Sequence, residues 1–449
     1  MEREVTLMEV LDARERRAAA QTRLRQTHGL PLISFTMNIP GPIKNSSLIR
    51  RTFALGRRAL SETLDRAGLV AAAREELDAV TGCELLWAVN APASRLKELC
   101  LAIEESAPVG RLFDMDVIGA DGVKLDRASP RTCLICGQAG RGCASRRVHS
   151  AAELQAAARK LMADHFLAAD RRRLETLATA ALTEEVRTTP KPGLVDRNNT
   201  GSHRDMTVET FLRSAGALES YWGECFLLGH ADADAPPESC FARLREAGLR
   251  AEARMYAATG GVNTHKGVIF TLGTVCGAIG RLWTAGEPCR DAEAILSGSA
   301  ELCRRAVEED LAAIRGREAL TGGERLYLRY GLTGARGELA AGLPGVAQTA
   351  LPVFEGALER GRDRNEAGVL ALLHLIARGT DSNMAARGGP EKAAAAARET
   401  AELLARGEAA ALAEAEALDR RFIRDDLSPG GCADLLAICY FLHDWKSGE

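Results

Sequence analysis

The chain has 449 residues, of which 46% are hydrophobic and 27% charged, and this balance predicts a globular protein of two or three domains. Its 58 Lys and Arg against 61 Asp and Glu leave a net charge of −3, which argues against nucleic-acid partners, because duplex binders usually carry a clear basic excess. The sequence shows no apolar leader and no apolar run long enough to span a bilayer, and it contains 12 Cys. We therefore expect a cytoplasmic protein with reduced thiols and no membrane partner.

The first 150 residues alternate helical and strand patterns, which predicts an α/β or α+β domain. Helices are predicted where good helix formers run without Gly or Pro, and strands where apolar runs are short. The predicted elements are a helix over 1–27, a strand over Leu32–Met37, a turn over 39–44, a helix capped by Ser46 or Ser47, a strand over 83–90, a helix over 94–106 and a strand over 111–119.

The stretch from Ala151 to Thr189 contains neither Gly nor Pro, and it follows a capping-box pattern at Ser150 and Glu153. It is long for a single helix of a globular protein, so it predicts either two helices or one helix that bridges two domains. We therefore expect the boundary near residues 155–175, with a first domain over 1–160 and a second over 170–449.

After Pro190 the sequence changes to helical segments rich in Ala and Leu, which Gly-rich polar loops separate. We expect a mainly α-helical second domain that carries its chemistry in these loops. The Ala- and Glu-rich stretch 391–420 is expected to form one amphipathic helix. The polar loops cover residues 190–206, 259–267, 330–338, 378–383 and 427–434.

Two carboxylates stand two residues apart in the predicted strand "FDMDVI". Residues at this spacing point to the same face of a strand, so Asp114 and Asp116 lie side by side and repel unless a cation stands between them. Oxygen ligands of this kind suit Mg²⁺ beside the phosphates of a transferred group. The alternative is a solvated pair on the strand face.

A cysteine-rich segment follows, with Cys133 and Cys136 in C-x₂-C spacing, then Cys143 and His149. Four nitrogen and sulfur ligands in one short segment suit a structural Zn²⁺ site with a closed tetrahedral shell. The alternative is a set of reduced cysteines beside a structural histidine.

The N-terminal region is locally basic, because residues 1–60 carry 11 Lys and Arg against 5 Asp and Glu, a net of +6. This charge suits an anionic ligand or partner, although a solvated basic helix explains it equally well. Within the region, Lys44 and Asn45 are placed to face a phosphate, or else belong to a tight turn between strand and helix.

The recurrence of Lys, Arg, His, Asp and Asn in five loops of one domain favours a polyphosphate site with a metal. Taken alone, each loop is equally consistent with an ordinary turn that connects two helices. In the loop 190–206, Pro190, Pro192 and Gly193 predict a rigid turn. The remaining polar groups of that loop, suited to metal ligation, proton transfer or sugar contacts, are Asp196, Asn199, His203 and Asp205.

Longer stretches resemble two known enzyme families. "ISFTMNIPGPIKNSSLIRRTF", "GRLFDMDVI" and the cysteine segment that ends in "RRVHS" resemble apo-citrate lyase phosphoribosyl-dephospho-CoA transferase over about residues 8–160. "TPKPGLVDRNNTGSHRDM", "ATGGVNTHKGVIFTLG", "ERLYLRYGLTGARGE" and "LSPGGCADLLA" resemble triphosphoribosyl-dephospho-CoA synthase over about residues 170–445. The chain is therefore similar to the fused, bifunctional form.

The resemblance implies that ATP and 3′-dephospho-CoA are joined with release of adenine, the 2′-hydroxyl of dephospho-CoA attacking the anomeric carbon of the ATP ribose. It further implies that the phosphoribosyl-dephospho-CoA unit is transferred to a serine of the citrate lyase acyl carrier protein, with release of diphosphate. By analogy it implies a nucleotidyltransferase-like first domain in which Asp114 and Asp116 hold Mg²⁺.

The same resemblance supplies the expected site residues. It implies catalytic roles for Asp114, Asp116, His203, Asp205, His265 and Asp381, with Asp205 or Asp381 as base or metal ligand. The expected substrate-binding residues are Lys44, Lys191, Asp196, Asn199, Arg204, Asn263, Lys266, Arg336, Asn383, Gly430 and Gly431. Ser202, Ser382 and Cys432 depart from the family pattern, and Cys432 leaves one hydroxyl contact in doubt.

Three alternatives stay open at the level of sequence. The equivalent activities for a malonate decarboxylase carrier protein fit the same prosthetic group. A metal-dependent phosphohydrolase also uses His and Asp on helices, but such enzymes show an adjacent His-Asp pair, and here Arg204 separates His203 from Asp205. A non-enzymatic assembly factor fits poorly, because a docking module needs a surface patch and not convergent polar loops.

Overall fold

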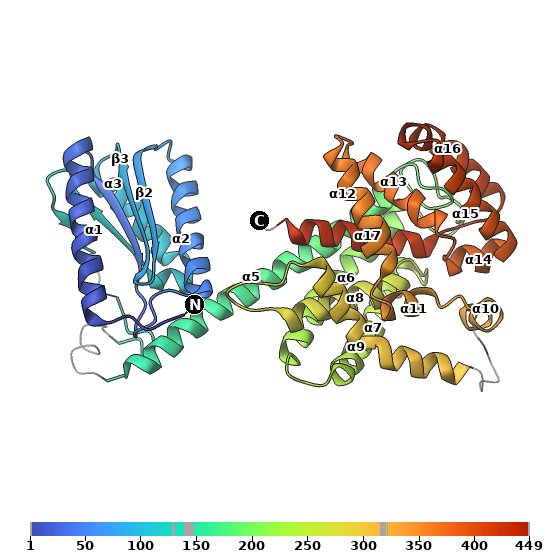
Figure 1. The fold of residues 1–449 in the computed structure, drawn as a ribbon, viewed down its shortest axis with the longest axis horizontal. Coiled ribbons are helices and arrows are strands. Elements are labelled where there is room, and N and C mark those ends of the chain that lie inside the picture. The colour runs from blue at the N-terminus through green and yellow to red at the C-terminus, as the bar shows by residue number, and fades with distance from the viewer. Residues whose placement is uncertain (1, 128–130, 139–147, 315–319, 321, 448–449) are drawn as a thin grey trace. The chain divides into compact units, whose positions relative to one another are not determined.

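The computed structural model describes residues 2–127, 131–138, 148–314, 320 and 322–447 (Figure 1). The chain forms two compact units, one of Met1–Ala169 with Thr284–Glu287 and the other of Asp170–Trp283 with Pro288–Glu449. The first combines a sheet with helices, and the described residues of the second form helices and connecting loops without a strand. The expected order, an α+β region followed by a mainly helical region, is confirmed.

The first unit contains one antiparallel sheet with strand order β2-β3-β1-β4-β5. Its elements are α1 (Leu7–His28), β1 (Leu32–Met37), α2 (Ser47–Arg66), β2 (Ala71–Ala79), β3 (Gly82–Val89), α3 (Ala93–Glu105), the 3₁₀ turn η1 (Pro108–Leu112), β4 (Phe113–Ile118) and β5 (Lys124–Leu125).

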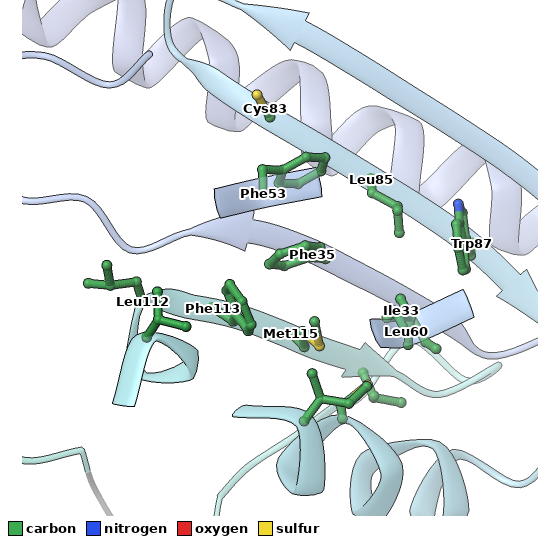
Figure 2. Close-up of a cluster of buried hydrophobic side chains, with 14 of the residues drawn as sticks. Ile33, Phe35, Phe53, Leu60, Cys83, Leu85, Trp87, Leu112, Phe113 and Met115 are labelled. Atoms are coloured by element: carbon green, nitrogen blue, oxygen red, sulfur yellow. The ribbon is translucent and has the colours of Figure 1, made fainter. Parts of the chain in front are cut away.

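One face of this sheet carries the main core of the unit. Figure 2 shows apolar side chains of β1, β3 and β4, among them Phe35, Leu85 and Met115, packed with Phe53 and Leu60 of α2. Burying a side chain of this size contributes about 1.5–3 kcal/mol. In β4 burial alternates, so Asp114 and Asp116 lie on the face opposite this core.

The other face of the sheet is partly covered by α1. Leu24 packs against Leu32 of β1 and against Leu86 and Ala88 of β3. The helix begins with a complete capping box at Thr6 and ends at Gly29, whose φ of 66° is left-handed.

Strand β2 was not predicted from the sequence. Its residues "AAAREELDA" are good helix formers, but they pair with β3 as an edge strand in which the side chains are alternately exposed and half-buried. Tertiary pairing here overrides the local propensity. By contrast, Ser46 is the N-cap of α2 and accepts a hydrogen bond from Ile49 N, as expected.

The uninterrupted stretch after Ser150 forms a single helix, α5 (Ala151–Arg187), of 37 residues. Its residues 151–169 belong to the first unit and 170–187 to the second, so of the two alternatives the single helix is correct. The capping box is present, because Glu153 Oε2 accepts from Ser150 N and Oγ, both at 2.8 Å, and Ser150 Oγ accepts from Glu153 N at 3.1 Å.

In the second unit, α6 packs on α7 and α8, while α13 packs on α12, α15, α16 and α17. No helix among the described residues combines the length and apolar character that crossing a bilayer requires. The elements after α5 are α6 (Val208–Ala231), α7 (Pro237–Thr259), α8 (Lys266–Leu282), α9 (Ala292–Ala313), α10 (Gly322–Tyr330), α11 (Gly334–Ala340), the π turn η3 (Val346–Ala350), α12 (Leu351–Glu359), α13 (Arg364–Ala377), α14 (Ser382–Gly388), α15 (Pro390–Ala405), α16 (Glu408–Arg424) and α17 (Gly430–Lys446).

The expectation of one helix over 391–420 is wrong. The chain breaks at Arg406 and Gly407, and Gly407 takes a φ of 100°, which interrupts the helix and starts α16 in a new direction.

Candidate functional site

A cavity of about 630 Å³ opens in the second unit, and all five polar loops predicted from the sequence contribute to its wall. The predicted site residues that line it are Lys191, His203, Asn263, His265, Lys266, Asp381, Asn383, Gly430 and Gly431. The predicted residues of this unit that do not line it are Asp196, Asn199, Arg204, Asp205 and Arg336.

The loop 190–206 is held by its own buried carboxylate. Asp196 Oδ1 accepts from Asn198 N at 2.7 Å and Asn199 N at 3.0 Å, and its Oδ2 accepts from Lys191 N at 3.0 Å. Asn199 in turn donates to Asp419 Oδ2 at 2.8 Å. Asp196 and Asn199 therefore shape the loop, while Lys191 and His203 face the cavity.

Residues far along the chain fasten this loop from outside. Gly193 N donates to Asp419 Oδ1 at 2.9 Å, and Ser202 Oγ donates to Leu427 O at 2.6 Å. Gly193 has a φ of 70°, and a Cβ there would stand 2.1 Å from Leu427 O. Only glycine fits this close approach of two backbones.

Lys191 forms a buried ion pair with Glu185 of α5 at the cavity wall. Both residues are buried, at 1% and 4% exposure. Burial raises the pKa of Glu185, and the neighbouring Lys191 offsets part of that rise. Because an unpaired charge is costly in such a place, each member of the pair needs the other.

Asp434, near the start of α17, presents a carboxylate that no hydrogen bond from the described residues reaches. The Asp434 side chain lines the cavity and is half-buried. Burial, and then the negative charges of Glu185 and Asp381, hold the pKa of Asp434 well above its usual range. Its Oδ2 lies against the backbone of Gly267, 1.9 Å from where a Cβ would stand.

His265 is 3% exposed and stands directly before α8. Thr264 Oγ1 donates to Ser214 Oγ at 2.8 Å, and Ser214 Oγ lies 2.6 Å from His265 Nδ1. We assign the serine as the donor to Nδ1, which places the ring proton on Nε2, a buried atom with no hydrogen-bond partner among the described residues. Burial, with the charge of Lys191, lowers the pKa of His265 to about 3.

His203 connects the loop 190–206 to the segment that precedes α17. Its Nε2 lies 2.8 Å from Ser428 Oγ, and its Nδ1 lies 3.4 Å from Arg387. Arg387 also donates to Ser202 O and Asp426. Burial and the charge of Arg387 lower the pKa of His203.

Asp381 joins the starts of two helices. Its Oδ1 accepts from Met384 N at 2.8 Å, which caps α14, and its Oδ2 accepts from Cys432 N at 2.8 Å in the first turn of α17. Burial raises the pKa of Asp381, and these backbone hydrogen bonds oppose the rise. The contacts give Asp381 a positioning function in this structure.

Positive charge and backbone donors converge on the cavity. Both α8 and α17 begin there without a hydrogen bond from an N-cap side chain. Lys266 N donates to Asn263 Oδ1 and Cys432 N to Asp381 Oδ2, so the first-turn N–H groups left for a ligand are those of Gly267 and Val268 in α8 and of Gly430 and Gly431 in α17. The cationic side chains in the wall are Lys191, Lys266, Arg378 and Arg387. Such a combination suits a polyphosphate.

Sequence reasoning missed five charged groups of this wall, Glu185, Glu338, Asp434, Arg378 and Arg387. Asp434, Arg378 and Glu338 fall inside loops that the sequence marked as polar, so a local signal existed for them. Glu185 and Arg387 lie within helices and carry no local signal, because only the fold brings them to the cavity.

In the first unit, Asp114 and Asp116 pair in register with Thr36 and Ser34 of β1. Asp116 Oδ2 lies 2.6 Å from Lys124 Nζ, and Asp114 Oδ1 lies 3.4 Å from Arg131. Both carboxylates remain partly exposed, at 45% and 26% of the side chain. Two partly open carboxylates on one strand face fit the oxygen ligands that Mg²⁺ requires.

Arg131 is held beside this pair by a buried glutamate. Glu104 of α3 accepts from Arg131 at 2.9 Å, from Arg127 at 2.7 Å and from Met115 N at 2.7 Å. Burial raises the pKa of Glu104, and these donors lower it in part.

Lys44 closes the turn after β1, because its Nζ donates to Ile39 O at 2.5 Å. Burial, with the charge of Arg14, lowers the pKa of Lys44. Asn45 donates to Asp78 Oδ1 at 2.6 Å and to Ala79 O at 2.7 Å. In the described structure both residues thus brace the turn, and their contact with a phosphate stays a prediction.

The structure brings three of the four predicted zinc ligands together. One ligand atom each from Cys133, Cys136 and His149 lie within 4.8 Å of one another. Cys143, the fourth residue of the predicted set, lies outside the described residues.

Comparison with known proteins adds independent findings. Residues 171–449 match the family described as ATP:dephospho-CoA triphosphoribosyl transferase, and residues 5–165 match the family described as apo-citrate lyase phosphoribosyl-dephospho-CoA transferase. The chain is 34% identical to "Protein CitXG" of Haemophilus influenzae, over 98% of this chain and 97% of that protein. It is 44% identical to a probable 2-(5''-triphosphoribosyl)-3'-dephosphocoenzyme-A synthase of Citrobacter koseri and 42% identical to such a synthase of Klebsiella pneumoniae, over 59% and 60% of this chain and 88% and 89% of those proteins.

Proposed function

The chain belongs to the family of fused transferases that joins an apo-citrate lyase phosphoribosyl-dephospho-CoA transferase to an ATP:dephospho-CoA triphosphoribosyl transferase, and from this premise we propose that it both makes and attaches the citrate lyase prosthetic group. The helical unit joins ATP and 3′-dephospho-CoA and releases adenine. The sheet-containing unit moves the product to the acyl carrier protein. The observation that carries the proposal is the cavity, whose wall holds four cationic side chains and the half-buried Asp434, a carboxylate that no described residue hydrogen-bonds.

In the first reaction the 2′-hydroxyl of dephospho-CoA attacks the anomeric carbon of the ATP ribose. The new carbon–oxygen bond forms as the carbon–nitrogen bond to adenine breaks, and its electron pair leaves with adenine. We assign Asp434 as the base that takes the hydroxyl proton, because its pKa is held well above the ordinary value for aspartate, which makes the carboxylate a stronger proton acceptor, and because no hydrogen bond from the described residues occupies it. A positioned base of this kind contributes roughly 10²–10⁴ in rate.

The triphosphate lies, in this proposal, between the starts of α8 and α17. Backbone N–H groups there, with Lys266, Arg378 and Arg387, neutralise its charge. Lys266 lies 3.0 Å from Glu252 and has to leave this partner to reach a phosphate. A Mg²⁺ ion bound to the triphosphate would supply further charge neutralisation.

His265 donates a hydrogen bond to the substrate through Nε2. The Thr264–Ser214 pair sets this tautomer, and the low pKa of His265 keeps the ring neutral at physiological pH. Because Nε2 is buried and unbonded, a substrate acceptor at this place removes the cost of an unsatisfied donor, about 1–3 kcal/mol.

In the second reaction the carrier serine oxygen attacks the α-phosphorus of the triphosphate, and diphosphate leaves. Asp114 and Asp116 are the residues that would hold Mg²⁺, which neutralises phosphate charge when bound. Lys124 and Arg131, which pair with these carboxylates, are placed to bind the phosphates. These roles lead us to propose a nucleotidyltransferase-like arrangement of the unit.

Two assays test the proposal. The first incubates the protein with ATP, Mg²⁺ and 3′-dephospho-CoA and follows adenine by chromatography. The second adds the apo carrier protein of citrate lyase and measures the adduct by mass spectrometry, with a malonate decarboxylase carrier as the competing acceptor. Release of ADP or phosphate without adenine would exclude the synthase and favour a phosphohydrolase.

The division of labour is tested by two variants in the same assays. We expect Asp114→Ala to abolish the carrier adduct and to spare adenine release, and Asp434→Asn to do the reverse when the isolated intermediate is supplied. The exposed Asp65→Asn, at the end of α2, is the control and should change neither. Loss of both activities in Asp114→Ala would contradict the assignment of two separate sites.

A further inference from the structure

The first unit contains a cluster of three metal-binding side chains that the transfer reaction does not use. One ligand atom each of Cys133, Cys136 and His149 lie within 4.8 Å of one another. A tetrahedral zinc ion with two sulfur ligands and one nitrogen ligand sets these atoms roughly 3.5–3.8 Å apart. A shift of about 1 Å is therefore enough to close the cluster on an ion.

The backbone around the two cysteines is shaped to aim both thiols at one point. Gly137 N donates to Cys133 O at 3.1 Å, and Cys133 N donates to Gln138 O at 2.7 Å. This tight turn needs Gly137, whose φ of 69° is left-handed. Leu134, between the cysteines, packs against the main core and anchors the turn.

The third ligand stands in an equally fixed position. His149 directly precedes Ser150, the N-cap of α5, and the capping box with Glu153 holds that helix start. His149 Nε2 is buried and has no hydrogen-bond partner among the described residues. A buried ring nitrogen without a partner is unfavourable unless a ligand satisfies it.

We propose that Cys133, Cys136 and His149 bind one zinc ion, which ties the turn at Gly137 to the start of α5. Two sulfur ligands and one imidazole are a donor set that selects zinc over magnesium or calcium. The ion lies outside the transfer chemistry, but it braces the segment that carries Arg131, whose guanidinium contacts Glu104 and Asp114. It is thus a structural element of the first unit, and it goes beyond the proposed function.

The test is metal content of the full chain after incubation with ZnCl₂ and desalting. We expect one zinc per chain in the native protein, and less than about a tenth of that in Cys133→Ser, Cys136→Ser and His149→Ala. Cys289→Ser, which changes a cysteine that lies outside the cluster, should keep its zinc. Adenine release shows only that the second unit of each variant is intact, and the far-ultraviolet circular dichroism spectrum serves as the folding control for the whole chain.

A second measurement covers the case in which a variant folds poorly. Titration of the native protein with Co²⁺ should produce the visible absorption of a tetrahedral thiolate site, and added Zn²⁺ should remove it. Zinc should also protect Cys133 and Cys136, but not Cys289, from alkylation. A native protein that retains no zinc, or a Cys136→Ser variant that retains a full equivalent, would overturn the proposal.

Discussion

The carboxylate of Asp434 occupies the space beside Gly267 that any side chain at residue 267 would need. Oδ2 stands 1.9 Å from the position of a Cβ there. The two residues lie near the starts of α17 and α8, so the contact sets how closely two helix N-termini approach each other in the cavity wall.

Substitution Gly267→Ala should therefore displace Asp434 and reduce adenine release by about 10²-fold, since a shift of 1 Å at a reacting group costs that much. The matched control is Gly216→Ala in α6, where a Cβ meets no atom within 4 Å. Alanine there should leave activity unchanged and stabilise the helix by about 1 kcal/mol. Equal activity in the two variants, measured as kcat/KM, would show that the contact has no function.

The raised pKa of Asp434 predicts a pH dependence of adenine release. The base is active only when ionised, so kcat/KM should rise with pH and level off at a pH well above the ordinary value for aspartate, about 4. Asp434→Asn should lose most of the activity, and its remaining kcat/KM should no longer rise with pH. Asp205→Asn, a residue favoured from the sequence but exposed and outside the cavity, should keep both. A flat pH profile in the native protein would contradict the assignment.

The same group should make the folded protein less stable as pH rises. Its pKa is higher in the folded state than in the unfolded state, so ionisation above the unfolded value costs folding free energy. Asp434→Asn removes this cost and should raise Tm at pH 7.5, while the two proteins should converge at pH 4. A lower Tm of the variant at pH 7.5, by scanning calorimetry, would refute the prediction.

The tautomer of His265 can be tested with two amides. Glutamine places its NH₂ near the position of Nε2, whereas asparagine places its amide near Nδ1, so His265→Gln should retain at least 10-fold more adenine release than His265→Asn. Ser214→Ala should lower activity as well, because it frees the ring to adopt the other tautomer. No variant should shift the pH profile between 5 and 9, since the pKa of His265 is about 3. Equal activity of the two amide variants would argue against the assigned tautomer.

The Lys191–Glu185 ion pair predicts strong coupling in stability. Lys191→Met leaves Glu185 buried and unpaired, which should cost about 3–5 kcal/mol of unfolding free energy. The double variant Lys191→Met with Glu185→Leu should recover most of this loss, although activity should not return. Urea denaturation of both single variants and the double variant measures the coupling, and simple additivity of the two losses would contradict it.

The fold could be predicted from the sequence where the local signal and the tertiary environment agree. Leu32–Met37 has the apolar character of a buried strand, and Ser46 and Ser150 cap the helices that follow them. The edge strand β2 was missed because its Ala and Glu residues favour a helix, and only pairing with β3 makes them a strand.

The candidate site shows the same division. The five loops were visible because glycine and polar residues cluster in them, and they do meet at one cavity. What local patterns could not reveal is which polar groups brace the wall and which face the cavity. Asp196 accepts hydrogen bonds within its own loop and does not line the cavity. The same loop is also held by Asp419, which lies 226 residues after Gly193 and which no local pattern could connect to it.

The fastening of the loop 190–206 to Leu427 and Asp419 also bears on the order in which the protein is made. The residues that line the cavity extend from Leu182 to Ala437. During synthesis, some 250 further residues are therefore added after the first lining residue before the last one emerges from the ribosome. Gly193 and Ser202 meet their partners only at that point. The sheet of the first unit is complete by Leu125 and can fold while the ribosome still works, whereas the cavity becomes competent for substrate only when α17 has left the exit tunnel.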